Sequence, residues 1–230
     1  MSFAVFVKIY SNDLQSRLKQ NTWMTKQNII EQKILPYFKD KKINEIKPAD
    51  VIAWQNEIMK TQDKNGKLYS PTYLKTIHNQ LSAIFNHAVR FYELKSNPAR
   101  KAGNMGKEKT KEMLFWTKEE YLKFSDLMMD KPISFYAFEI LYWCGIRLGE
   151  LLALTQEYFD FKKSTVRINK SYQRINCNDV ITEPKTPKSI RVIKMPNFLS
   201  EEKRNILNQY MVLNLKIDYF PLLKAISIMR

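Results

Sequence analysis

Acidic residues, cysteine and histidine are all scarce in this chain of 230 residues. The shortage of acidic residues indicates the kind of partner, and the shortage of cysteine indicates the cellular compartment. Asp and Glu number 23 against 38 Lys and Arg, so the formal net charge of +15 favours a polyanionic partner, nucleic acid before an anionic membrane. The two cysteines, Cys144 and Cys177, are too few for a disulfide framework and indicate a reducing compartment. No apolar run approaches the roughly 18 residues of a spanning helix, and the first residues do not resemble a signal peptide.

The first part of the chain has the apolar spacing of amphipathic helices. Hydrophobic residues make up 44% of the chain and aromatic residues 13%, enough for a folded core. We expect a four-helix domain over residues 1–95. Its predicted helices cover residues 3–15, a segment from a cap at Thr25 to near Pro36, Pro48 to about Lys60, and Pro71 to a stop at Asn97-Pro98.

Residues 96–113 differ in composition, because basic residues alternate with glycine and no apolar period is present. The segment is interpreted as a flexible linker, and also as a linker that crosses a DNA backbone; both can hold. Its phosphate contacts would not depend on base sequence. The candidate DNA-binding residues here are Arg100, Lys101, Lys107, Lys109 and Lys111.

The second half contains an arginine and a glutamate in an otherwise apolar segment, residues 142–154. Gly145 can end one helix in a left-handed conformation, and another then begins almost at once. Glu150 lies one turn after Arg147, so its carboxylate can hold the guanidinium in place. A planar, permanent cation fixed in this way suits a phosphate. The alternative is a structural ion pair at a helix junction.

Helical spacing precedes this segment and strand-like alternation follows it. Thr117 and Glu120 form a capping box for one helix, and Pro132 begins the next. Residues 183–189 contain prolines, Lys185 and Lys188, and are predicted to form a turn between strands. The expected fold class is therefore mainly α with a small antiparallel β-sheet. The predicted strands are residues 165–170, one beginning at Val180-Ile181, and residues 190–195.

The order of residues 144–154 is a small residue, Gly, an apolar residue, Arg, any residue, Gly, Glu and then leucines. This resembles the first catalytic-arginine motif of the tyrosine recombinase (phage integrase) family of phages and mobile elements. Residues 1–95 resemble its core-binding domain, and residues 114–210 the N-terminal part of its catalytic domain. The resemblance implies DNA cleavage through a phosphotyrosine link, without metal or nucleotide cofactor.

Carried over by position, the resemblance assigns a role to three residues. Arg147 would stabilise charge on the phosphate in the transition state, and Glu150 would orient it. Lys185, in a Lys-Thr pair on a β-hairpin, would be the general acid. Lys188 is the fallback for that role and otherwise a DNA-binding residue.

Several family residues have no match. No histidine follows His87, and neither Tyr210 nor Tyr219 is assigned as the nucleophile, nor any residue as the second arginine. His87 and Arg90 have the family's His-x-x-Arg spacing but precede Arg147, so we interpret them as a solvated or DNA-facing helix surface. We therefore expect a C-terminally truncated integrase, inactive in cleavage as it stands. Residues 211–230 are interpreted as an atypical tail, which a frameshift would explain.

Two other functions remain open: a non-catalytic DNA-binding regulator of recombination, and a basic helical RNA-binding protein. The expected partners are double-stranded DNA and full-length integrase protomers, with no membrane and no small-molecule substrate. The expected location is the bacterial cytoplasm, at the nucleoid.

Overall fold

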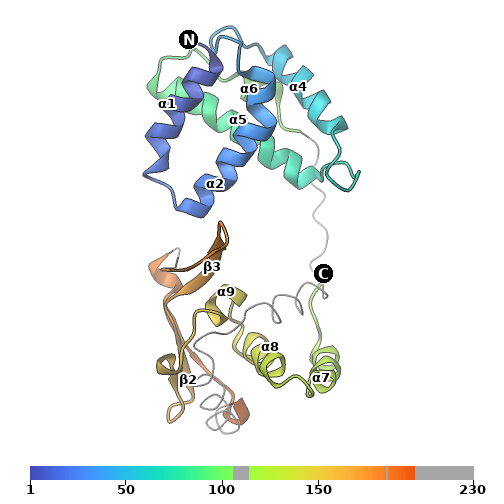
Figure 1. Cartoon of the computed structure of the whole chain (residues 1–230), viewed down its shortest axis with the longest axis vertical. Coiled ribbons are helices and arrows are strands. Elements are labelled where there is room, and N and C mark those ends of the chain that lie inside the picture. The colour runs from blue at the N-terminus through green and yellow to red at the C-terminus, as the bar shows by residue number, and fades with distance from the viewer. Residues whose placement is uncertain (106–113, 185, 200–230) are drawn as a thin grey trace. The chain divides into compact units, whose positions relative to one another are not determined.

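The computed structural model describes residues 1–105, 114–184 and 186–199, and the chain divides into two compact units between Glu112 and Met113 (Figure 1). Within those ranges, none of the helices is both long and apolar enough to cross a membrane. The predictions that lie outside the described residues concern Lys107, Lys109, Lys111, Lys185 and the tail of residues 211–230.

Within residues 1–105, the regular elements of the N-terminal unit are helices, apart from isolated bridges, as the apolar spacing predicted. Its core consists of large side chains from different helices, and Phe3, Trp54 and Phe85 are completely or almost completely buried. Its elements are α1 (Phe3–Gln15), α2 (Gln20–Ile29), a π-helical segment η1 (Ile30–Ile34), α3 (Leu35–Phe38), α4 (Pro48–Lys60), α5 (Pro71–Phe91) and α6 (Pro98–Ala102).

The predicted cap at Thr25 is wrong, because α2 begins at Gln20. Thr25 lies inside the helix, where its hydroxyl donates to the carbonyl of Asn21 at 3.0 Å. Threonine makes this bond to residue i−4 within helices as well as capping them, so sequence alone does not separate the two. The helical segment ends at Phe38, near Pro36 as predicted. Before the proline, a π-helical turn brings the Leu35 N–H to the carbonyl of Ile30.

The segment expected to be a linker begins later than predicted. Asn97 does not close α5, which ends at Phe91; it caps α6, and its side chain accepts from the Arg100 N–H at 3.0 Å. Ala99 and Met105 are buried in the core of the N-terminal unit. Arg100 and Lys101 therefore lie exposed on a short helix of this unit and not on an unstructured connection.

His87 is not the solvated residue that we expected. Its Nε2 lies 2.7 Å from Asp13 Oδ2 on α1, and its ring contacts Tyr10 edge-on with centroids 5.3 Å apart. Aromatic neighbours leave only 11% of the side chain exposed. His87 thus joins α1 to α5, whereas Arg90 is exposed one turn later.

The C-terminal unit combines helices with two small antiparallel sheets, and the expected fold class is confirmed. Thr117 and Glu120 form the predicted capping box, with bonds of 3.3 and 2.8 Å. The helices are α7 (Lys118–Leu127), α8 (Pro132–Cys144) and α9 (Leu148–Leu151), and 3-10 turns occur at Gln156–Tyr158 and Pro187–Ser189. The strands are β1 (Phe159–Asp160), β2 (Thr165–Ile168), β3 (Ser171–Ile175), β4 (Asn178–Thr182) and β5 (Arg191–Lys194).

The sheet topology differs from the predicted hairpin around the lysines. One sheet has the order β1-β2-β5, and β3 pairs only with β4 in the other. Residues 183–190 therefore connect two sheets and are not the turn between two paired strands. The hairpin lies instead at Asn176 and Cys177, whose positive φ values of 50° and 62° form its turn.

The buried core of this unit has partly buried leucines packed against it. Leu148, Leu151, Leu152 and Leu154, and likewise Leu141 and Tyr142, are only half-buried. The buried positions are instead Ile140, Cys144, Ile146 and Ala153. Because α9 is a single turn, a 3.6-residue period could not identify its buried face.

Candidate nucleic-acid interface

Gly145 ends α8 as predicted and sets the direction of the chain before Arg147. Its φ of 59° is left-handed, and its N–H donates to the carbonyl of Leu141 at 3.1 Å. Arg147 then caps α9 in an extended conformation, with φ −80° and ψ 151°. The arginine and Glu150 are thereby brought to the same helix start.

Glu150 lies at the centre of the site, with only 6% of its side chain exposed. Arg147 donates to it twice: the backbone N–H to Oε2 at 2.9 Å and Nη1 to Oε1 at 3.0 Å. Arg191, the first residue of β5, also donates twice, with Nη2 to Oε2 at 2.8 Å and Nη1 to Oε1 at 3.1 Å. Burial alone would raise the pKa of Glu150, but these bonds lower it to about 2, so the carboxylate is ionised at neutral pH.

Arg147 and Arg191 differ in how much of the guanidinium group is exposed to solvent. The Arg147 side chain is 76% exposed and gives Glu150 a single side-chain bond, whereas the Arg191 side chain is 30% exposed. Two guanidinium groups around one carboxylate leave a net charge of +1. A guanidinium held at its base and open at its tip can bind a phosphate through two parallel hydrogen bonds.

Gly149 allows α9 to lie directly against β3. A Cβ added there would meet Ser171 Oγ at 2.7 Å and the Tyr172 carbonyl oxygen at 2.8 Å, closer than real Cβ contacts. The glycine is therefore required by this close approach and not by its own backbone conformation. Sequence reasoning gave Gly149 no structural reason and did not find Arg191, which lies 41 positions from its partner Glu150.

The lysine-bearing segment, residues 183–189, contacts this site through Ser189. Arg191 Nη1 donates to the carbonyl of Ser189 at 3.2 Å, and Lys188, next to Ser189, is exposed. The structure thus links the segment to the Arg191–Glu150 pair. The roles of Lys185 and Lys188 stay predictions.

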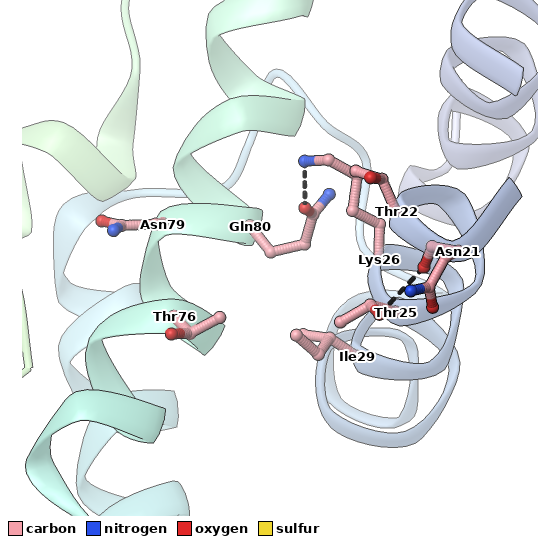
Figure 2. A pocket seen from close by; sticks show the side chains of 8 residues that line it. All are labelled: Asn21, Thr22, Thr25, Lys26, Ile29, Thr76, Asn79 and Gln80. Carbon is pink, nitrogen blue, oxygen red and sulfur yellow. Dashed lines mark hydrogen bonds between the residues drawn. The ribbon is translucent and has the colours of Figure 1, made fainter. Parts of the chain in front are cut away.

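The N-terminal unit has a polar cleft between α2 and α5, which sequence reasoning also missed (Figure 2). Figure 2 shows Lys26 extending from α2 toward Gln80 on α5, and Nζ donates to Gln80 Oε1 at 2.8 Å. Gln80 Nε2 in turn donates to the hydroxyl of Tyr10 at 3.2 Å. The cleft has a volume of about 420 Å³ and is lined by Asn21, Thr22, Thr25, Lys26, Ile29, Thr76, Asn79 and Gln80.

Lys26 carries a positive charge that no carboxylate balances among the residues described here. Its hydrogen-bond partner Gln80 is uncharged and buried, and partial burial lowers the pKa of the Lys26 ammonium. An anionic group that entered the cleft would find a cation held by a neutral partner. The surrounding threonine and asparagine side chains add hydrogen-bonding groups.

Comparisons with known proteins show which proteins this chain resembles. Residues 2–59 match the family described as phage integrase, N-terminal SAM-like domain. The ICEBs1 integrase of Bacillus subtilis (strain 168) is 29% identical over 196 residues, which cover 85% of this chain and 51% of that protein. The chain thus spans about half the length of this curated relative.

Solved structures of two integrases share the fold. The Tn1549 transposon integrase in complex with circular intermediate DNA has a TM-score of 0.74 at 19% identity, covering 90% of this chain and 65% of that one. A lambda integrase tetramer bound to a Holliday junction has a TM-score of 0.59 at 20% identity, covering 80% of this chain and 51% of that one. The chain therefore shares a fold with parts of both integrases. The chain is a homologue of the tyrosine recombinases of the phage integrase family.

Proposed function

We propose that this chain binds duplex DNA as part of a site-specific integrase acting in DNA integration and recombination. The observation that carries the proposal is the exposed Arg147 guanidinium, held at its base by the buried, ionised Glu150. The formal charge of +15 and the DNA-bound integrases of the same fold support it. Full-length integrase protomers are the proposed protein partners.

The two units would bind DNA in different ways. Arg147 would contact a backbone phosphate at the site of chemistry, with Glu150 as the orienting carboxylate. Lys26 in the α2/α5 cleft and Arg100 and Lys101 on α6 would bind phosphates without regard to base sequence. Polar neighbours of Lys26 in the cleft, such as Asn79, could also reach base edges.

For the chemistry, we propose that Arg147 stabilises charge on the phosphate and that Lys185, or Lys188 in its place, donates a proton to the leaving oxygen. This polypeptide by itself would bind without cutting. Its sequence contains no histidine after His87, and no tyrosine or second arginine matches the family pattern. Cleavage would then require residues supplied from outside these 230 positions.

The test measures duplex binding at several salt concentrations for the wild type, Arg147→Gln and Lys42→Gln. Lys42 is the matched control, because it is an exposed cation already paired with Glu45 at 3.0 Å. Arg147→Gln should weaken binding about tenfold and reduce the salt slope by about one phosphate contact, whereas Lys42→Gln should change little. Equal losses in both variants would contradict the assignment of Arg147.

Two further measurements separate the alternatives. Equal affinity for RNA hairpins and duplex DNA would favour the RNA-binding function. A covalent protein–DNA product from a nicked duplex would overturn binding without cleavage. A recombination assay with a full-length integrase present would show whether the chain blocks that enzyme, as the regulator hypothesis requires.

A further inference from the structure

Glu150 is shared by two arginines that are used differently. Arg147 is exposed and touches the carboxylate with one side-chain nitrogen, whereas Arg191 is mostly covered and touches both carboxylate oxygens. We propose that Arg191 is a positioning residue for the DNA-binding site, which keeps Glu150 from neutralising Arg147 and fixes the lysine-bearing segment beside it. The proposal rests on the proposed function, since it names how the same site is kept competent for phosphate.

The hydrogen bonds of Arg191 argue against a direct contact with DNA. Its Nη1 donates to Glu150 Oε1 and to the carbonyl of Ser189, and its Nη2 donates to Glu150 Oε2. Both terminal nitrogens are therefore engaged within the protein. A phosphate would have to displace a buried carboxylate to be bound in the same two-point manner. Arg147, by contrast, gives the carboxylate only one of its terminal nitrogens, Nη1.

The charge balance explains why a second arginine is useful. A pair made of Arg147 and Glu150 alone would be neutral and would attract a phosphate only weakly. Glu150 is needed, however, because its two bonds hold both the backbone and the guanidinium of Arg147. With Arg191 present, the carboxylate can orient Arg147 while the cluster keeps its charge of +1.

The position of Arg191 in the fold lets its side chain connect three parts of the C-terminal unit. Backbone pairing fixes it opposite Ile168 on β2, so β5 begins at a defined register. Its side chain then reaches Glu150 on α9 and the carbonyl of Ser189, which ends the segment containing Lys188. The Arg191 side chain thereby joins β5, α9 and the lysine-bearing segment. It connects the start of α9, where Arg147 lies, with the segment that contains Lys188.

A double-mutant cycle on duplex binding distinguishes positioning from direct contact. Arg191→Gln should weaken duplex binding about tenfold, as Arg147→Gln does, because Glu150 then neutralises Arg147. The double variant Glu150→Gln with Arg191→Gln should recover to within about threefold of the wild type, since the competing charge is gone and two neutral amides replace the pair. Arg191→Lys, which keeps the charge but lacks the planar pair of donors, should bind between Arg191→Gln and the wild type.

The matched control is Arg167→Gln, an exposed arginine on the neighbouring strand β2, which should show no comparable loss and no recovery with Glu150→Gln. The proposal is overturned if Arg191→Gln binds like the wild type. It is also overturned if the double variant with Glu150→Gln stays as weak as Arg191→Gln, because a direct contact or a purely structural role would give that result.

An acid-unfolding measurement without DNA tests the role of Arg191 independently of the proposed function. Arg191→Gln should raise the pH at which the C-terminal unit unfolds in acid, because Glu150 loses two hydrogen bonds, whereas Arg167→Gln should leave it unchanged. If the wild type fails to bind duplex DNA while this shift is seen, the proposed function fails and the Arg191–Glu150 coupling stands. If no shift is seen, the coupling itself is refuted.

Discussion

The two units of the chain are stabilised by different kinds of interaction. The core of the N-terminal unit consists of large apolar side chains such as Phe3, Trp54 and Phe85, which are at most 1% exposed. The C-terminal unit has a smaller apolar core and, in addition, two buried carboxylates, Glu139 and Glu150, at 7% and 5% exposure. The first unit thus depends on packing, and the second depends also on hydrogen bonds to buried carboxyl groups.

Glu139 shows what this means for the second unit. Its Oε1 accepts from the Tyr121 hydroxyl at 2.5 Å and from Ser125 Oγ at 2.9 Å, and its Oε2 accepts from Trp143 Nε1 at 3.1 Å. Burial, together with the bond to Glu139, raises the pKa of Tyr121. The network joins α7 to the end of α8, just before the turn that presents Arg147. Hydrogen bonds to a buried carboxyl group therefore help to position the site in this unit.

The largest expected effect is on the packed unit. Trp54→Ala should reduce the free energy of unfolding of the N-terminal unit by about 4 kcal/mol, because it leaves a cavity and removes the bond of 2.9 Å from Nε1 to the carbonyl of Lys33. Urea unfolding monitored by hydrogen exchange would report each unit separately. Trp116→Ala is the control, since Trp116 is 42% exposed and should cost far less.

Acid should act on the second unit through Glu150. Its pKa is about 2 in the folded unit and about 4.3 for an unperturbed glutamate, so the ionised form stabilises the fold above pH 4.3. That contribution, roughly 3 kcal/mol, is lost as the pH falls from about 4.3 toward 2. Stability measured against pH in the wild type and in Glu150→Gln tests this. An unchanged acid profile in Glu150→Gln would show that other groups control the transition.

Loss of the Glu139 carboxylate should have the next largest effect. Glu139→Ala leaves the donors of Tyr121, Ser125 and Trp143 without their acceptor, at a cost of about 2 kcal/mol in the C-terminal unit alone. Tyr121→Phe removes one of the three bonds and should cost less. A comparable loss in the N-terminal unit would contradict an effect confined to the C-terminal unit.

The smallest effect should be the same in both units. Ser70→Ala and Thr117→Ala each remove a helix cap, with bonds of 3.3 Å to the N–H of Tyr73 and of Glu120, and each should cost about 1 kcal/mol. Thermal unfolding of the two variants gives the comparison. A much larger loss for Thr117→Ala would mean that α7 stabilises its unit beyond its own cap.

Local signals were enough to predict much of the fold. Pro48, Pro71 and Thr117 mark helix starts that the structure confirms, and Gly145 is the left-handed helix end. The prediction of a helix cap at Thr25 was wrong, because a threonine hydroxyl can donate to a carbonyl inside a helix as readily as it can cap one. These signals work because each depends on residues within about one turn of one another.

The sequence predicted only the part of the candidate site whose residues are close to one another in the chain. Arg147 and Glu150 are three residues apart, and the structure shows the hydrogen bonds that this spacing suggested. Arg191 is far away in sequence and joins the site through sheet register, which no short pattern encodes. The β3–β4 hairpin was missed as well, since β3 has no regular alternation, with Gln173 and Arg174 adjacent, and no neighbouring glycine marks the turn. The catalytic role of Lys185 stays a prediction.

The hairpin turn at Asn176 and Cys177 offers a practical means of observing the site. Cys177 is exposed at the tip, while the other thiol, Cys144, is buried. A maleimide dye should therefore label one position selectively, on the hairpin whose strand β3 lies against Gly149 of α9. Fluorescence anisotropy of that dye would report occupation of the site by DNA in real time, without altering any of the arginines.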